Sequence, residues 1–227
     1  MPSEPNAEPE PSSPLFAAIY DPATALLERT LLRPHRDYLV ADLDGTVLDL
    51  GAGTGAMVPY FKRVADSSTE FHAIEPDRHM RKQATEKAER QSLPIRIEAA
   101  PAEALPYDDA AFDVVIASMV FCTIPDVESA MAEVARVLKP GGELRFLEHV
   151  IDDGWRARVQ SLLAPLWERV AGGCHLTRQT GSRLVTDRSF DVVEIERFNL
   201  GITPVRPFVR GRLRKRSVPP TQKLGRD

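Results

Sequence analysis

The chain has 227 residues, of which 43% are hydrophobic and 27% charged, and these proportions exclude wholesale disorder, a collagen-like repeat and a disulfide-stapled scaffold. Lys and Arg number 29 against 33 Asp and Glu, so the net charge of −4 produces no strong overall field that would favour nucleic acid as a partner. With two cysteines, no signal-like N-terminus and no apolar run long enough to cross a membrane, we expect a cytoplasmic protein with one folded domain.

The two ends of the chain differ in composition from its middle. Residues 1–14 contain five of the 19 prolines and few apolar side chains, which predicts a disordered N-terminal tail. Residues 214–227 are predicted to form a basic C-terminal tail, which either makes a weak contact with anionic membranes or serves only to keep the protein in solution. The folded domain between them should cover residues 15–213, with its last strand ending near Leu213.

Between these tails, short β-rich runs alternate with stretches of helical hydrophobic spacing. The clearest helix follows Asp126, a good N-cap residue, and ends before Pro140. Such alternation predicts an α/β fold, a Rossmann-like seven-stranded, mostly parallel sheet with helices on both faces and ligands at the carboxyl ends of the strands. The predicted strands cover residues 47–50, 71–74, 95–99, 112–120, 143–150, 190–200 and 205–213, and the predicted helices residues 56–64, 78–90, 127–138 and 155–170.

The first predicted strand runs into a glycine-rich turn. The sequence VLDLGAGTG places Gly51, Gly53 and Gly55 between an apolar strand and a helix, so that a ligand can approach bare backbone. Glu75 follows at the end of the second strand, where nucleotide-binding sheets place a carboxylate for the ribose hydroxyls. Because the glycine spacing differs from the G-x-G-x-x-G of pyrophosphate binders, it predicts an adenosine ligand without a pyrophosphate. The alternative is a tight βα turn beside a solvated strand end.

Several segments together resemble the successive motifs of class I S-adenosylmethionine (SAM)-dependent methyltransferases. The resemblance spans roughly residues 40–213 and implies SAM as the cofactor. Pro101 stands where this family often has Asp, so an adenine-amino contact expected there would come from Glu103 or from backbone. The matching segments are VLDLGAGTG at 47–55, EPD at 75–77, AEALPY at 102–107, FDVV at 112–115 and LKPGG at 138–142.

The same resemblance implies which residues contact SAM. Asp49 and the glycine turn would face its methionine part, and Glu75 its ribose. Met80 would lie on the adenine face, with Ala102 and Glu103 at the adenine edge.

Groups for the methyl acceptor are expected near the ends of later strands and in the N-terminal segment. Phe16 and Tyr20 would belong to an N-terminal lid. Met119, Phe121 and Cys122 would complete an apolar substrate pocket, with ordinary core packing as the alternative.

His149, at the end of the fifth predicted strand, is the candidate catalytic base because the usual pKa of histidine lies near neutrality. A lone histidine at a strand end equally fits a structural role. Cys122 and Cys174 are interpreted as small packing residues, and no metal is expected.

The carboxyl half narrows the choice of acceptor. LEHV at 147–150, GCHLTR at 173–178 and VRP at 205–207 resemble a methyltransferase-like family that includes membrane-associated thiol methyltransferases. LFAAIYD at 15–21 resembles the N-terminal lid of quinone and lipid methyltransferases. These resemblances imply a small, apolar acceptor that is a thiol, a quinone or a lipid-like molecule.

Two other functions are open alternatives. A non-catalytic SAM-fold subunit would serve a partner, although the intact glycine turn argues against it. DLDGT at 42–46 matches the signature of haloacid dehalogenase-like phosphatases, in which Asp42 would attack phosphorus and Asp44 would assist the leaving group. Such an enzyme also needs a magnesium-binding acidic pair after a later strand, whereas the acidic pair at 108–109 precedes its strand.

Overall fold

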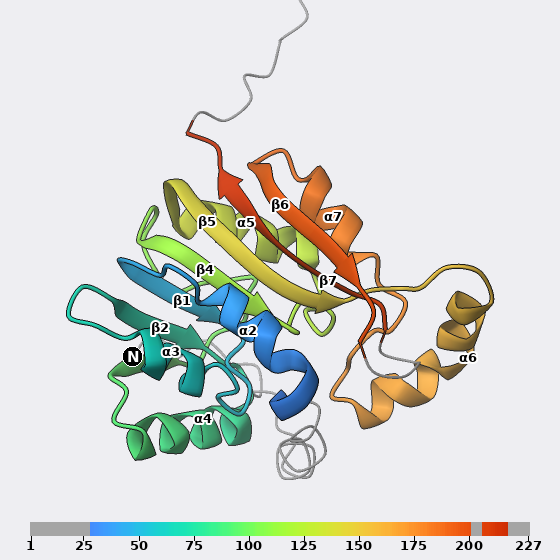
Figure 1. The fold of residues 1–227 in the computed structure, drawn as a ribbon, viewed down its shortest axis with the longest axis horizontal. Helices are drawn as coiled ribbons and strands as arrows, with labels where there is room; N and C mark the ends of the chain where they lie inside the picture. The colour runs from blue at the N-terminus through green and yellow to red at the C-terminus, as the bar shows by residue number, and fades with distance from the viewer. Residues whose placement is uncertain (1–27, 201–205, 218–227) are drawn as a thin grey trace, which may run out of the picture.

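The computed structural model describes residues 28–200 and 206–217 and contains one seven-stranded sheet (Figure 1). The strand order is β3-β2-β1-β4-β5-β7-β6, and β7 runs antiparallel to the other six strands. This order confirms the predicted seven-stranded, mostly parallel sheet. The strands are β1 (Thr46–Leu50), β2 (Glu70–Ile74), β3 (Ile95–Glu98), β4 (Phe112–Ser118), β5 (Leu138–His149), β6 (Phe190–Phe198) and β7 (Phe208–Lys215).

The described helices are η1 (Glu28–Leu32), α2 (Arg33–Leu39), α3 (Val58–Val64), α4 (Arg78–Arg90), α5 (Val127–Val137), α6 (Gly154–Val170) and α7 (Thr180–Thr186). Helices cover both faces of the sheet. Successive residues of a strand point to opposite faces, so the apolar residues of β1 pack against a helix on each side. Val47 of β1 belongs to the same apolar cluster as Phe61 of α3. The next residue, Leu48, belongs to the cluster that contains Ala130 of α5. Within residues 28–200 and 206–217, no helix is long and apolar enough to span a membrane.

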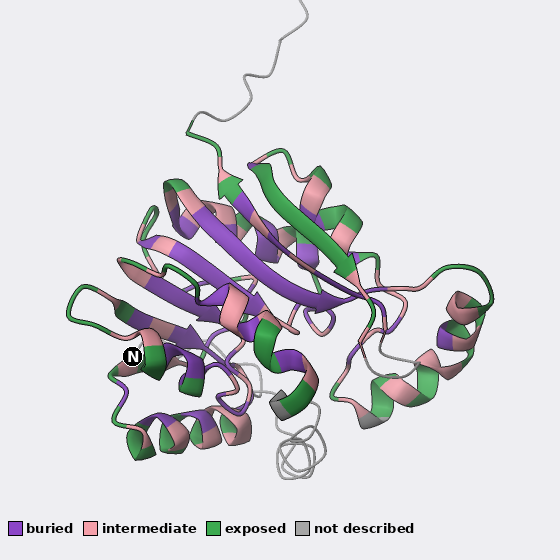
Figure 2. Cartoon of the chain, viewed as in Figure 1, coloured by how far each residue is buried: buried purple, intermediate pink, exposed green. Residues whose placement is uncertain are grey.

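The middle of the sheet is the most deeply buried part of the fold. Figure 2 shows buried residues concentrated in β1, β4 and β5, whereas the edge strand β6 is mostly exposed. Strand β4 ends at Ser118, two residues earlier than predicted, and the chain turns at Met119, which has a φ of +61°. The residues that follow this turn therefore leave the sheet at the carboxyl end of a rigid central strand.

The basic residues near the C-terminus belong to the sheet. Strand β7 continues to Lys215, two residues beyond Leu213, where the basic tail was expected to begin. Arg212 and Arg214 both pair with the carboxylate of Glu143, at 2.7 and 3.1 Å. The last strand therefore extends two residues beyond its predicted end, while the boundary of the folded domain stays a prediction.

Candidate functional site

The glycine turn after β1 combines close packing on one side with open space on the other. Gly51 has a φ of +75°, and a Cβ added there would come within 2.3 Å of the Val120 side chain. Gly53 has a φ of +56°, and a Cβ added there would meet no atom of the described residues within 4 Å. Both positions therefore favour glycine, but only at Gly53 does the bare backbone face space in which a ligand could lie.

Glu75 holds this turn from the end of β2. Its side chain is buried, Oε2 accepts a hydrogen bond from the Gly53 N–H at 2.8 Å, and Oε1 accepts one from the Asp77 N–H at 2.9 Å. Burial raises the pKa of Glu75, and these two hydrogen bonds oppose the shift. The expected contact of Glu75 with a ribose stays a prediction, and the structure adds a second role because the same carboxylate shapes the glycine turn.

Asp49 lies beneath the turn, one residue before the end of β1. It is 2% exposed, and burial raises its pKa to about 7, while the positive charge of Arg36 opposes that shift. Arg36 comes from α2 and is itself 2% exposed. The sequence contained no signal for this interaction, since the two residues come from different elements.

The residues predicted for the adenine side stand at the same edge of the sheet. Met80 is half-buried in the first turn of α4, where its N–H donates to the Asp77 carboxylate. Ala102 is buried in the segment after β3, and the Glu103 carboxylate accepts a hydrogen bond from the Asp126 N–H at 3.2 Å. Their contacts with adenine stay predictions.

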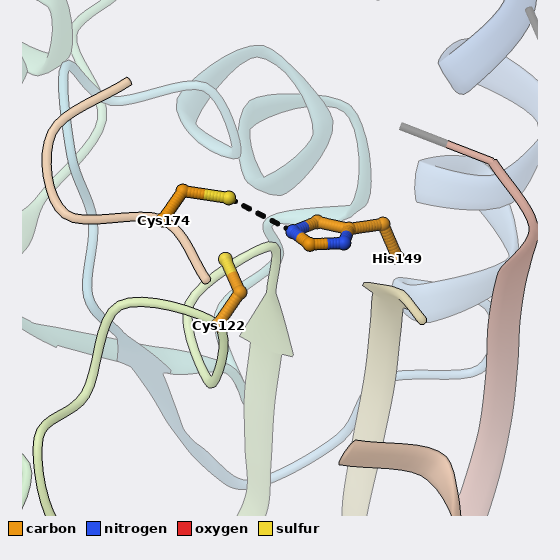
Figure 3. A group of neighbouring side chains, drawn as sticks. All are labelled: Cys122, His149 and Cys174. Carbon is orange, nitrogen blue, oxygen red and sulfur yellow. Dashed lines mark hydrogen bonds between the residues drawn. The ribbon is translucent and has the colours of Figure 1, made fainter. Parts of the chain in front are cut away.

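A group of sulfur and imidazole side chains lies at the ends of β4 and β5 (Figure 3). Cys122 follows the turn after β4, His149 is the last residue of β5, and Cys174 lies in the segment after α6. All three are buried, and their Sγ and ring nitrogen atoms lie within 4.8 Å of one another. The Nε2 atom of His149 is 2.9 Å from the Sγ atom of Cys174. We call these three residues the Cys-His-Cys cluster.

The cluster shifts the ionisation of its own members. The contact with Cys122 and then that with His149 lower the pKa of Cys174, whereas the contact with Cys174 raises the pKa of Cys122. Burial alone would lower the pKa of His149, but the contact with Cys174 and the charge of Glu148 together raise it. His149 is therefore in contact with a cysteine, which fits the structural role left open by the sequence, and its use as a catalytic base stays a prediction.

The loop that carries Cys122 is held by a buried carboxylate and a guanidinium. The Oε1 atom of Glu148 accepts hydrogen bonds from the N–H groups of Val120 and Phe121, at 2.8 and 3.0 Å. Burial raises the pKa of Glu148 to about 7, although these two hydrogen bonds act to lower it. The guanidinium of Arg178 donates to the Phe121 carbonyl at 2.7 Å. Both charged residues thus fix the loop 119–124.

The predicted apolar pocket is described only in part. Phe16 and Tyr20 lie outside the described residues. Phe121 is fully buried in the core cluster that includes Val127, and Met119 packs at the edge of the other core cluster. Contacts of these residues with an acceptor stay predictions.

The phosphatase alternative has no support in this geometry. Asp42 and Asp44 precede β1, so they stand at the amino end of that strand, away from the edge that carries the glycine turn. Asp44 accepts hydrogen bonds from the Gly45 N–H and the Ser68 hydroxyl, as a turn residue does. The structure therefore favours the interpretation of DLDGT as a turn that leads into β1.

Comparisons with known proteins agree on the type of domain. The family model described as a methyltransferase domain matches residues 48–146. The human thiol S-methyltransferase TMT1B is 32% identical over 173 residues, which cover 73% of this chain and 69% of that protein. The ubiquinone/menaquinone biosynthesis C-methyltransferase UbiE of Klebsiella pneumoniae is 33% identical over 139 residues, covering 58% of this chain and 55% of its own.

A solved structure supports the fold assignment. The crystal structure of a SAM-dependent methyltransferase from Aquifex aeolicus superimposes with a TM-score of 0.61 at 16% identity and covers 89% of this chain and 98% of its own. At this identity the likeness concerns the fold.

Proposed function

Because this chain belongs to the class I SAM-dependent methyltransferases, we propose that it transfers the methyl group of SAM to the sulfur of a small thiol. Methyl transfer from SAM is the reaction of the family, and the thiol acceptor is our proposal. The observation that carries it is the buried Cys-His-Cys cluster at the edge of the sheet where the glycine turn lies. A relative named as a thiol S-methyltransferase supports the same acceptor.

The residues around the glycine turn fit SAM. Open space in front of Gly53 leaves room for the cofactor against the backbone. The Glu75 carboxylate lies beside that space, and since each carboxylate oxygen can accept two hydrogen bonds, it can bind ribose hydroxyls as well as the two N–H groups that it already holds. SAM, when bound, supplies an electrophilic methyl group on a sulfonium sulfur.

The task left to the protein is to hold the acceptor sulfur in line with that methyl group, and positioning of this kind can contribute about 7–11 kcal/mol to lowering a barrier. The loop after β4 is suited to this task because Glu148 and Arg178 hold its backbone from two sides. Its Val120 side chain packs against Gly51, so the loop and the glycine turn are in contact.

The acceptor is tested by comparing nucleophiles of similar size. The full chain and SAM are incubated separately with 2-mercaptoethanol, with ethylene glycol as its alcohol analogue, with a short-chain hydroquinone and with phosphatidylethanolamine vesicles. We expect the S-methyl product together with an equal amount of S-adenosylhomocysteine from the thiol alone. Methylation of the hydroquinone or the amine without thiol methylation would refute the proposal, and SAM binding without turnover of any acceptor would favour the non-catalytic alternative.

Location and membrane contact are further parts of the proposal. Cys122 and Cys174 are free thiols, which suits the reducing cytoplasm. We propose that the C-terminal residues make a contact with anionic lipid that is weak because Arg212 and Arg214 are already paired with Glu143.

Sedimentation with phosphatidylserine vesicles at low ionic strength tests this contact. We expect a chain that lacks residues 218–227 to sediment less than the full chain, since Lys223 and Arg226 are removed. The comparison variant replaces Trp155, Leu162 and Leu166, the exposed apolar side chains of α6, by Ser. Sedimentation that survives the truncation and disappears in the α6 variant would show that the C-terminal proposal is wrong.

A further inference from the structure

The Cys-His-Cys cluster is assembled from three separate segments, and its members point toward a common centre (Figure 3). Cys122, His149 and Cys174 are 2%, 1% and 8% exposed, respectively. Cysteine sulfur and imidazole nitrogen are the ligands that zinc and similar soft divalent cations select in proteins. The chemistry of the donor set therefore suits a metal, although no metal was expected from the sequence.

The separations within the cluster also suit one ion. Zinc binds sulfur at about 2.3 Å and nitrogen at about 2.0–2.1 Å, so two such ligands of a tetrahedral ion lie roughly 3.6–3.8 Å apart. The three donor atoms of the cluster lie within 4.8 Å of one another, and the closest pair is 2.9 Å apart. These separations differ from those around a tetrahedral zinc ion by about 1 Å or less.

The charge of the three ligands also favours a divalent cation. Two cysteine thiolates and a neutral imidazole carry a charge of −2, which a divalent cation neutralises inside a buried site. The backbone next to one ligand is already fixed, because Glu148 binds the Phe121 N–H and Arg178 binds the Phe121 carbonyl. A metal site needs this kind of support around its ligands to hold a defined geometry.

We propose that Cys122, His149 and Cys174 bind one zinc ion, whose fourth coordination position receives the sulfur of the acceptor thiol. Three protein ligands with one open position are typical of catalytic zinc sites, whereas structural sites have four. The site lies at the edge that carries the glycine turn, because Val120, two residues before Cys122, packs against Gly51. The metal site stands on its own geometry, and the role of its fourth position rests on the proposed thiol acceptor.

The chemistry of that role balances without an additional oxidant or reductant. The thiol releases its proton to solvent when its sulfur binds the ion, since zinc favours the thiolate form of a ligand. A sulfur electron pair then forms the bond to the methyl carbon. The bond between that carbon and the sulfonium sulfur breaks, and its electron pair stays on the sulfur of S-adenosylhomocysteine.

Metal binding is measured on the reduced, chelator-treated full chain. Titration with Co²⁺ should produce the thiolate charge-transfer and tetrahedral d–d absorption bands with one ion per chain, and Zn²⁺ should displace it. Cys122→Ser, Cys174→Ser and His149→Gln should each weaken Zn²⁺ affinity at least about 100-fold in competition with a chromophoric chelator. His175→Gln is the matched control, since its imidazole neighbours Cys174 in the chain but lies outside the cluster, and it should bind like the parent.

Circular dichroism and SAM calorimetry verify that each variant is folded. Parent protein that binds neither ion at equimolar concentration, or that contains a disulfide between Cys122 and Cys174 when purified without reductant, would overturn the metal site. Equal thiol turnover by the metal-free and zinc-loaded parent would refute the role of the fourth position while leaving the thiol acceptor intact. Zinc binding without turnover of any thiol would refute the thiol acceptor and that role while leaving the metal site intact.

Discussion

Replacement of Glu75 by Gln tests the SAM site most directly. The carboxylate accepts N–H groups from Gly53 at 2.8 Å and from Asp77 at 2.9 Å. The amide keeps one acceptor oxygen, and its NH₂ group then faces the N–H group of Gly53 or that of Asp77. At least one hydrogen bond to a charged group is therefore lost. Such a bond contributes about 1.5–3 kcal/mol, which corresponds to a SAM affinity that is roughly 10- to 150-fold weaker.

Protein stability should respond less than affinity to this substitution. Burial raises the pKa of Glu75, which shows that the carboxylate is held in a poorly solvated place. The neutral amide avoids that desolvation cost, and this offsets part of the lost hydrogen bonding. We therefore expect the free energy of unfolding to fall by less than about 3 kcal/mol, so that the variant stays folded.

Calorimetric titration with SAM and urea unfolding check both expectations. Glu70→Gln is the matched control because Glu70 begins the same strand, and its side chain is 71% exposed. The control should bind SAM like the parent. A folded Glu75→Gln variant with parental SAM affinity would refute the assignment of Glu75 to the cofactor site.

Three more predictions concern the turn, the buried aspartate and the rejected motif. Gly53→Ala and Gly141→Ala should lose similar stability, about 1–2 kcal/mol, because both glycines have a positive φ and open space at Cβ, but only Gly53→Ala should bind SAM more weakly in calorimetry. Equal affinities in the two variants would contradict this. Burial raises the pKa of Asp49 from 3.8 to about 7, so the folded state retains a proton that the unfolded chain releases, and the stability from this group falls as pH rises through that interval. Urea unfolding at pH 5 and pH 8 should show the parent losing up to about 3 kcal/mol relative to Asp49→Asn, because the shift acts over about two pH units of this range, and parallel pH profiles would argue against the shift. The double variant Asp42→Asn with Asp44→Asn should keep SAM binding and methyl transfer within about threefold of the parent, and a magnesium-dependent phosphatase activity lost in Asp42→Asn would count against our assignment.

Local patterns in the sequence were sufficient to predict the strands and the glycine turn, and the SAM contacts placed there stay a prediction. Alternation of β-rich and helical segments predicted the parallel sheet, and the glycines after β1 with Glu75 after β2 predicted a ligand at its carboxyl edge. These signals can be read along the chain because turns and strand ends depend on residues close in sequence. The ends of strands were less predictable. Strand β4 ended before Met119 and β7 continued to Lys215, since pairing with neighbouring strands decides where a strand stops.

Only the tertiary structure brought together the members of the Cys-His-Cys cluster. Cys122 follows β4, His149 ends β5 and Cys174 follows α6, and their spacing matches no metal-ligand pattern. They meet because β4 and β5 are neighbours in the sheet and the segment after α6 returns to the ends of both strands. Likewise, Arg36 approaches Asp49 only through the packing of α2 on the sheet. Such contacts depend on which distant segments of the chain pack together in the core. Local sequence patterns do not predict this packing.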